Sequence, residues 1–419
     1  IVSKRKGADT YSFSDTIVNM CCGMLERLFD LFYVVMMYFV FGFLFDKVAL
    51  WHIPDHWTTW VAALLVGDLL AYWHHRLSHE INFLWAAHIV HHSSEEMNIT
   101  NVFRVSAFAV INRSFFWIWM PLMGFSPEMT TSAIVFIGLF QFVTHTRLVK
   151  KLGVLERFMV TPSHHRVHHG RNEKYLDKNY GHVFIIWDKM FGTFAPEEEE
   201  PDYGITTGLA SANPYWTYLH YWSDLFRRAK QANRWQDKLR VFIAPPTWTP
   251  EGVEFSGPAY QLDEEGQRMK YKLKMPFRLG LYVFVNIMIV LGAFLYLSTF
   301  KNTFENPTVL DLLTSPIMIQ LAVIIAVSAF SFGLLMERKR SAMLVELGRL
   351  FFLAINAGVI FWNAAYGSWI IGACVLGLSF FALWMVRMRD YFGYLPPEDM
   401  FEKIEQEPSS AEKEAVPTL

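Results

Sequence analysis

Long apolar stretches separated by polar segments dominate the chain. Eight such runs fall into two groups, 31–45, 57–73, 105–125 and 129–143 in the first half, and 279–299, 316–336, 342–362 and 367–386 in the second. A helix needs about 20 apolar residues to cross a bilayer, and several runs approach that length. The two short runs, 31–45 and 129–143, are either re-entrant or parts of longer tilted helices. The pattern predicts an integral membrane protein that crosses the bilayer several times.

Composition agrees with this interpretation and excludes several classes. Apolar residues make up 53% of the 419 residues and charged residues only 18%, whereas soluble domains carry about 25% charge. The chain is therefore neither disordered nor a disulfide scaffold, and its three cysteines are interpreted as reduced thiols. With 37 basic and 39 acidic residues, the chain has no overall positive field for nucleic acid.

Basic residues are concentrated in particular connections. Residues 145–278 hold 20 of the 37 lysines and arginines, and three more fill the turn between two apolar runs at 337–341. Because cytoplasmic loops carry the excess of Lys and Arg, we place these connections on the cytoplasmic side. Alternation of the eight runs then places 1–30, 74–104 and 387–419 on that side as well.

The predicted fold class is an all-α integral membrane protein. A four-helix catalytic membrane bundle with a cytoplasmic, histidine-rich cap occupies 1–196, and a cytoplasmic insert or linker occupies 197–278. A second transmembrane bundle follows at 279–390, and 391–419 is a polar, flexible tail. The second bundle shows no chemistry, so we assign it to packing or oligomerisation.

Histidines form three clusters at helical spacing, all in segments placed on the cytoplasmic side. Residues three or four apart share one face of a helix, so His75 and His79 can converge on one ion. His88 can pair with His91 or His92 in the same way, and His165 can pair with His168 or His169. Neutral imidazole binds iron, zinc and copper. Eight histidines are too many for one ion and fit a pair of ions.

Four further residues lie close to these clusters. His145 follows the fourth apolar run and is either a ninth ligand or a histidine at headgroup level. Asp68 and Tyr72 share a helical stripe with His75 and His79. An intramembrane carboxylate is costly and usually functional, so Asp68 either accepts the second N–H of an imidazole or bonds another helix. Glu80 either binds metal, orients a histidine or relays protons, or is solvated at the interface.

These motifs resemble a known family. The segments at 75–80 (HRLSHE), 88–94 (HIVHHSS) and 161–172 (TPSHHRVHHGRN) are similar to signatures of the fatty acid hydroxylase / sterol desaturase superfamily of integral-membrane di-iron enzymes. The segments 177–180 and 185–194 extend the likeness to its alkylglycerol monooxygenase branch. Simple sterol desaturases lack a second bundle, which favours that branch.

The resemblance implies a membrane monooxygenase that uses O₂ to hydroxylate a lipid alkyl chain. In that branch the ether-linked carbon of alkylglycerols is hydroxylated, and fatty aldehyde and glycerol are released. It also implies Glu80 as a functional acidic residue and two iron ions held by eight histidines. Those histidines are His75, His79, His88, His91, His92, His165, His168 and His169.

The resemblance further implies an external electron donor, since no dinucleotide-binding fingerprint occurs in the sequence. Tetrahydrobiopterin is that donor in the branch, and a separate redox partner is the alternative. The other expected partners are the lipid substrate and the bilayer. The membrane is the endoplasmic reticulum if the source is eukaryotic, and the inner membrane if it is bacterial.

Other functions stay open at this point. Within the superfamily, the chain could hydroxylate or desaturate sterols, fatty acyl chains or amino-lipids. A haem-binding or metal-binding membrane carrier is a different class, as is a non-catalytic sensor. Transport requires ligands near the middle of the bilayer, whereas these histidines lie beyond the ends of the apolar runs.

Overall fold

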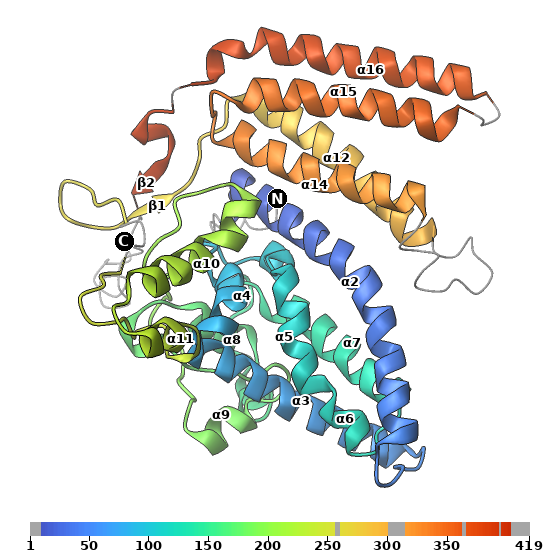
Figure 1. Ribbon diagram of the computed structural model, residues 1–419. Helices are drawn as coiled ribbons and strands as arrows, with labels where there is room; N and C mark the ends of the chain where they lie inside the picture. The colour runs from blue at the N-terminus through green and yellow to red at the C-terminus, as the bar shows by residue number, and fades with distance from the viewer. Residues whose placement is uncertain (1–9, 256–259, 301–314, 363–365, 394, 404–419) are drawn as a thin grey trace, which may run out of the picture.

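The computed structural model describes residues 10–255, 260–300, 315–362, 366–393 and 395–403, and most of them are helical (Figure 1). The helices of the first half are α2 (Phe13–Lys47), α3 (Trp57–Glu80), α4 (Asn82–His92), α5 (Ala107–Trp117), α6 (Trp119–Leu122), α7 (Pro127–Thr144), α8 (Pro162–His169) and α9 (Ile186–Phe191). Those that follow are α10 (Pro214–Gln231), α11 (Trp235–Ile243), α12 (Phe277–Phe300), α14 (Pro316–Met336), α15 (Ala342–Phe361) and α16 (Gly367–Arg387).

Helix α3 is the central element of the first half and packs against α4, α5 and α7. Its first turn is fixed by a capping box in which His56 and Thr59 exchange hydrogen bonds with each other's backbone. The buried side chains between α3 and its neighbours include Ala63, Trp117 and Ala133. This packing directs the polar C-terminal turns of α3, which carry two of the histidine positions, toward α4 and α8.

Candidate membrane spans lie mainly in the second half. Among the described residues, α12, α14, α15 and α16 are long and apolar enough to cross a bilayer, and α2 is a fifth if its two halves, bent by 43°, form one span. The second-half helices begin and end within two residues of the predicted runs. The chain is thus an integral membrane protein, but its described residues contain fewer such helices than the eight predicted.

The prediction of one span over 105–125 is wrong. The run is divided at Ile118 into α5, with 11 residues, and α6, with four. At 1.5 Å per residue, an 11-residue helix spans about 16 Å, which is half of the apolar core of a bilayer. Pro121 contributes to the break because it has no N–H to continue the helical hydrogen bonds.

The C-terminal segment is only partly as predicted. Residues Phe401–Lys403 form strand β2, which pairs antiparallel with β1 (Met269–Tyr271). The described structure is therefore not entirely helical, and the predicted flexible tail contains an ordered strand that pairs with a strand of the predicted insert. Residues 404–419 of that tail lie outside the described part of the chain.

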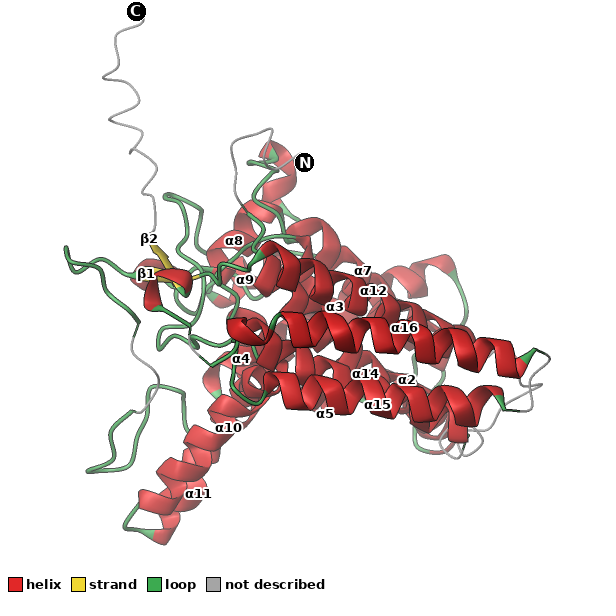
Figure 2. Cartoon of the chain, turned by 90° about the horizontal axis from the view of Figure 1, so that it is seen from above, coloured by secondary structure: helices red, strands yellow, loops and turns green. Residues whose placement is uncertain are grey.

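The connection between the halves contains a helical hairpin. Helices α10 and α11 run across the direction of α15 and α16, near one end of these helices (Figure 2). The hairpin is joined to the second half where Ser211 Oγ and the Ala212 N–H donate to Glu337, directly after α14. Gly333 has no room for a side chain there, since a Cβ would lie 2.9 Å from the Cα of Asn213.

Candidate metal centre

The structure brings all nine predicted histidines together, in two groups. Within each group, one ring nitrogen from every histidine lies within 4.8 Å of the others. The five-histidine group contains His75, His79, His88, His92 and His168. The four-histidine group contains His91, His145, His165 and His169. Helices α3 and α4, the end of α7, and α8 therefore supply one shared site.

Helices α4 and α8 each contribute to both groups. On α4, His88 and His92 belong to one group and His91 to the other. Consecutive helical residues point about 100° apart, so neighbouring histidines diverge whereas those four apart converge. The two groups adjoin each other, because the rings of His92 and His169 stack with centroids 4.6 Å apart.

The inward-facing nitrogens are spaced like ligands around an ion. The Nε2 atoms of His88 and His92 are 3.0 Å apart, and those of His92 and His168 are 3.2 Å apart. In the other group, Nε2 of His145 lies 2.9 Å from that of His165. Two nitrogens at right angles around an ion, each about 2.1 Å from it, lie about 3.0 Å apart. The donor sets therefore fit a transition metal in each group.

Buried unpaired nitrogens provide a second test of this fit. The Nε2 atoms of His75 and His79 are buried and have no hydrogen-bond partner. A buried polar atom without a partner is costly, and a bound cation would satisfy both atoms. His75 and His79 thus each direct an unpaired ring nitrogen into the five-histidine group.

Backbone carbonyls fix the protonation of several rings. Nδ1 of His75 donates to the carbonyl of Tyr180 at 2.7 Å, and Nδ1 of His168 donates to that of Lys178 at 2.9 Å. Nδ1 of His145 donates to the carbonyl of Gln141 at 2.7 Å. Since a carbonyl can only accept, the proton is on Nδ1 and the Nε2 lone pair points into the site. This orientation is typical of metal-binding histidines.

The segment that supplies two of these carbonyls has an unusual backbone. Asp177 and Asn179 have φ values of 58° and 56°, in the left-handed region that Asp and Asn tolerate better than most residues. Asn179 is fully buried, and its side chain donates to the carbonyls of His164 and Ala195. The left-handed turn thereby directs the carbonyls of Lys178 and Tyr180 toward the two rings.

Asp177 is a site residue that the sequence reasoning missed. Its Oδ1 lies 3.4 Å from Nδ1 of His79, and this hydrogen bond is the largest cause that lowers the pKa of the carboxyl below its usual value. A carboxylate at this position orients the ring and makes it a better donor to a metal. The Asp-Lys-Asn sequence was a usable signal, because Asp and Asn favour the left-handed conformations found here.

Burial favours the neutral form of several of these histidines, as metal binding requires. It lowers the pKa of His91 to about 4 and that of His145 to about 3, and it places the pKa of His75, His165 and His169 well below the usual value. Loss of hydration of the charged imidazolium is the largest cause in each case. Neutral rings at physiological pH leave their lone pairs available.

Of the two alternatives predicted for Asp68, the structure shows the bond to another helix. Asp68 on α3 accepts from Nε1 of Trp187 on α9 at 2.9 Å, and also from the backbone N–H groups of Val183 and Phe184, at 2.9 and 3.0 Å. Asp68 thus holds the segment that follows the Tyr180 carbonyl. Its effect on His75 passes through the backbone, because a carboxylate so committed has no contact with the ring.

Tyr72 and Glu80 lie beside the histidine groups rather than within them. The hydroxyl of Tyr72 is 3.0 Å from Oγ1 of Thr193. Glu80 pairs with Arg76 at 2.8 Å on the helix surface, where its side chain is 45% exposed. Neither side chain is part of the two groups, and their catalytic roles stay predictions.

Three further histidines surround the site. The ring of His74 packs against Phe116, and Nδ1 of His164 accepts from the Thr161 N–H in the cap of α8. Both therefore point away from the groups. The ring of His182 lies 4.9 Å from that of His75, and its buried Nδ1 has no hydrogen-bond partner. His182 is thus adjacent to the five-histidine group without belonging to it.

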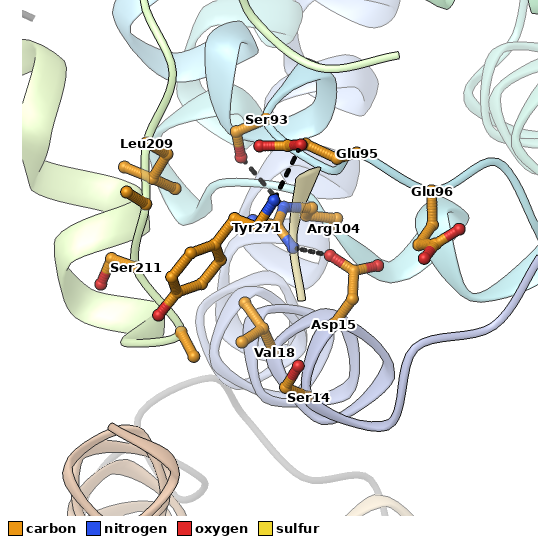
Figure 3. Close-up of a pocket in the computed structure, with 12 residues that line it drawn as sticks. Ser14, Asp15, Val18, Ser93, Glu95, Glu96, Arg104, Leu209, Ser211 and Tyr271 are labelled. Atoms are coloured by element: carbon orange, nitrogen blue, oxygen red, sulfur yellow. Dashed lines mark hydrogen bonds and ion pairs between the residues drawn. The ribbon is translucent and has the colours of Figure 1, made fainter. Parts of the chain in front are cut away.

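A polar pocket lies just beyond the end of α4 (Figure 3). In it, Arg104 donates to Oδ1 of Asp15 at 2.9 Å and to Oγ of Ser93 at 3.0 Å. Glu95 pairs with Arg268 at 2.7 Å and accepts from the Tyr271 N–H. These bonds tie the start of α2 and strand β1 to the residues after His92, so they fix the end of α4 that carries three of the grouped histidines.

Comparison with known proteins defines the class to which this site belongs. The fatty acid hydroxylase family model matches residues 60–193, a range that contains all nine grouped histidines. This class consists of membrane oxidoreductases that hydroxylate lipid chains, and its members imply iron at such a site. No solved structure matches the chain.

Several relatives specify the family more closely. The chain is 32% identical to alkylglycerol monooxygenase of Homo sapiens, over 84% of this chain and 77% of the relative, and 34% identical to that of Danio rerio, over 80% and 73%. It therefore belongs to the alkylglycerol monooxygenase family and is a lipid monooxygenase. The ornithine lipid hydroxylase OlsE of Rhizobium tropici is 32% identical over 38% of this chain and 49% of its own length.

Proposed function

We propose that the chain holds one iron ion in each histidine group and hydroxylates the ether-linked carbon of alkylglycerols. The observation that carries this proposal is the division of nine buried histidines into two adjoining sets of inward-facing nitrogens. The names of the relatives in human and zebrafish support the choice of substrate. Iron in such a nitrogen-rich site supplies the O₂ activation that attack on a C–H bond requires.

The reaction balances with one O₂ and two external electrons. One oxygen atom enters the C–H bond next to the ether oxygen, and the other leaves as water with two protons. The hydroxylated carbon is then a hemiacetal, which collapses to fatty aldehyde and glycerol. We propose tetrahydrobiopterin as the electron donor, with a separate redox partner as the alternative.

The residues of the chain serve this chemistry by positioning. The carbonyls of Lys178 and Tyr180 and the carboxylate of Asp177 hold the rings of His168, His75 and His79 in place. Asp68 holds the segment that follows these carbonyls. Preorganised ligands with fixed protonation keep the site ready without rearrangement in each turnover.

We also propose a four-helix membrane bundle for the first half, formed by α2, α3, α5 with α6, and α7. Several large apolar side chains on these helices are exposed, including Phe39 (66%), Phe115 (65%) and Leu139 (62%). Exposed apolar side chains of this size are favourable in contact with lipid tails. A cleft between these helices would hold the alkyl chain of the substrate.

The histidine groups are proposed to face the cytoplasm. The basic turn at Arg338, Lys339 and Arg340 joins α14 to α15 at the end where α14 meets the start of α10. Helix α10 packs in turn on α4, which carries three of the ligand positions. The excess of Lys and Arg in cytoplasmic loops therefore supports a cytoplasmic site. The membrane is the endoplasmic reticulum in a eukaryote and the inner membrane in a bacterium.

Product analysis tests the proposal. The chain, reconstituted in lipid with ferrous iron and O₂, should convert an alkylglycerol to fatty aldehyde when tetrahydrobiopterin is added, and metal analysis should give about two iron ions per chain. A His91→Ala variant is the matched control and should give no aldehyde. Hydroxylation of a sterol, acyl lipid or amino-lipid without aldehyde from the ether would contradict the substrate assignment. A strong Soret band would indicate a haem carrier instead.

The amino-lipid alternative has one specific observation in its favour. The relative from Rhizobium tropici acts on ornithine lipid, and its likeness covers 38% of this chain. The human relative covers 84% of the chain and so includes the second half. The greater coverage favours the ether lipid, and an ornithine lipid belongs in the same product assay.

A further inference from the structure

The hairpin of α10 and α11 exposes an unusual apolar surface. On α11, Trp235, Leu239 and Ile243 are 67%, 62% and 70% exposed. Their spacing of four residues places them on one stripe of the helix. The opposite face carries Val241, which is 1% exposed and packs in the core shared with α4 and α10. A helix on the surface of a soluble protein shows water its polar face, whereas this helix exposes an apolar stripe in addition to its polar residues.

Basic residues border the stripe on both sides. At 100° per residue, Lys238 lies about 100° from Leu239 in one direction, and Arg240 lies as far in the other. Both residues are exposed. Long basic side chains beside an apolar stripe place their stems on apolar surface and their charges at lipid headgroup level. This combination is typical of helices that lie in a membrane surface.

The exposed surface continues toward the predicted membrane region. Phe226 on α10 is 61% exposed, and its ring packs on that of Phe242 with centroids 5.5 Å apart. Trp222, one turn earlier on α10, packs on Phe108 of α5 at 5.8 Å. On α5, Phe115 is 65% exposed within the apolar run at 105–125. Apolar side chains thus lead from that run onto the hairpin.

The orientation of the hairpin agrees with a position at the membrane boundary. Helices α10 and α11 run across α15 and α16 near the end of these candidate spans (Figure 2). If the spans cross the bilayer, a hairpin that crosses their direction at one end lies along the membrane surface. Helix α10 starts against Gly333, three residues before the end of α14, so its depth is tied to that span.

We propose that α10 and α11 form an interfacial hairpin whose exposed face, made by Phe226, Trp235, Leu239 and Ile243, inserts into the adjacent lipid leaflet. Residues 197–278, predicted to be a cytoplasmic insert, then rest partly in the membrane surface. The hairpin shares its core with α4. The depth of the hairpin in the leaflet therefore sets the height of the two histidine groups above the lipid.

Fluorescence quenching by lipid tests this proposal independently of activity. The experiment uses the whole chain with the substitution Cys374→Ser. The two other native cysteines, Cys21 and Cys22, are buried and are therefore left in place. Single variants Leu239→Cys and Ile243→Cys would carry an NBD fluorophore, and Glu264→Cys, at an exposed turn, is the matched control. The chains would be placed in phosphatidylcholine nanodiscs with and without lipid spin-labelled near the headgroup.

We expect blue-shifted emission at 239 and 243, with quenching by the labelled lipid about twofold stronger than at 264. Quenching at 239 and 243 no stronger than at 264 would overturn the proposal, whether water or another protein then covers the face. A membrane-impermeant maleimide gives a second measurement on the unlabelled variants, and it should react more slowly at 239 and 243 than at 264. If one variant does not fold, Trp235→Cys replaces it on the same stripe.

Discussion

Nδ1 of His79 lies 3.4 Å from Oδ1 of Asp177, and Nε2 of the same ring points into the five-histidine group without a partner. One carboxylate outside the groups therefore orients a ring whose other nitrogen is free to bind metal. Asp177 occupies a left-handed backbone position, with φ of 58°. Its backbone and side chain both position ligands, since the carbonyl of the next residue accepts from His168.

Asp177→Asn should weaken metal binding without unfolding the chain. Asparagine tolerates the left-handed backbone but loses the negative charge beside His79. Loss of such a supporting carboxylate typically lowers metal affinity about 10-fold or more. Metal retained at increasing chelator concentration measures the effect, and Glu173→Gln, on the exposed surface nearby, is the control. Equal retention in both variants would show that Asp177 does not support the site.

His168→Ala and His91→Ala should each remove metal from a different group. The first belongs to the five-histidine group and the second to the four-histidine group. Loss of a ligand from one group should reduce bound iron from about two ions to about one, and should abolish turnover in both variants. Metal analysis and product formation check this, with His220→Ala, outside both groups, as the control. Near-full turnover in either variant contradicts the ligand assignment.

Asp68→Ala should destabilise the fold. The carboxylate is fully buried and accepts three hydrogen bonds, from Val183, Phe184 and Trp187. Leaving these donors unpaired costs at least about 3 kcal/mol. Thermal unfolding in detergent should show the loss, whereas Asp46→Ala, at an exposed position of α2, should change stability by less than about 0.5 kcal/mol. An unaltered melting temperature for Asp68→Ala would mean that the segment of Val183, Phe184 and Trp187 keeps its structure without this carboxylate.

The metal-free protein should lose stability in mild acid. The pKa is about 4 for His91 and about 3 for His145 in the folded chain, against about 6.5 in the unfolded chain. Below about pH 6.5 the unfolded state binds protons that the folded state does not, so stability falls as pH falls toward 4. Thermal unfolding of chelator-treated protein from about pH 8 to pH 5 measures this. A constant melting temperature would contradict it.

A buried ion pair should hold the second half together. Arg349 donates to Glu346 at 2.6 Å, and it also donates to Ser328 and Asn286 at 3.2 and 2.6 Å. Both side chains are almost fully buried, so Arg349→Ala would leave an uncompensated carboxylate and cost about 3–5 kcal/mol.

The double variant Glu346→Leu/Arg349→Met is the control for this pair. Replacing both charges by apolar side chains of similar size should be less costly than removing one. Thermal unfolding of the two variants provides the comparison. If the single variant is as stable as the unmodified chain, the pair does not support the packing of α12, α14 and α15.

The second-half helices show how much of the fold local sequence determines. The run at 316–336 forms α14 with the same ends, and the run at 342–362 forms α15 to within one residue. In a long apolar segment only a helix satisfies every backbone polar group internally. Such a segment specifies its structure without reference to the rest of the chain. The run at 105–125 differs, because its break at Ile118 accompanies packing against α2 and α3.

The sequence by itself determined which side chains gather at the candidate metal centre, since imidazoles at helical spacing are typical of metal sites and all nine predicted residues meet. It could not decide how His91 and His92, or His168 and His169, divide between the two groups. That division depends on how α4 and α8 are rotated against each other. The acceptor role of Tyr180, the partners of Asp68 and the pairing of β1 with β2 likewise join residues more than 100 positions apart. Such contacts follow from packing in three dimensions, which no local pattern encodes.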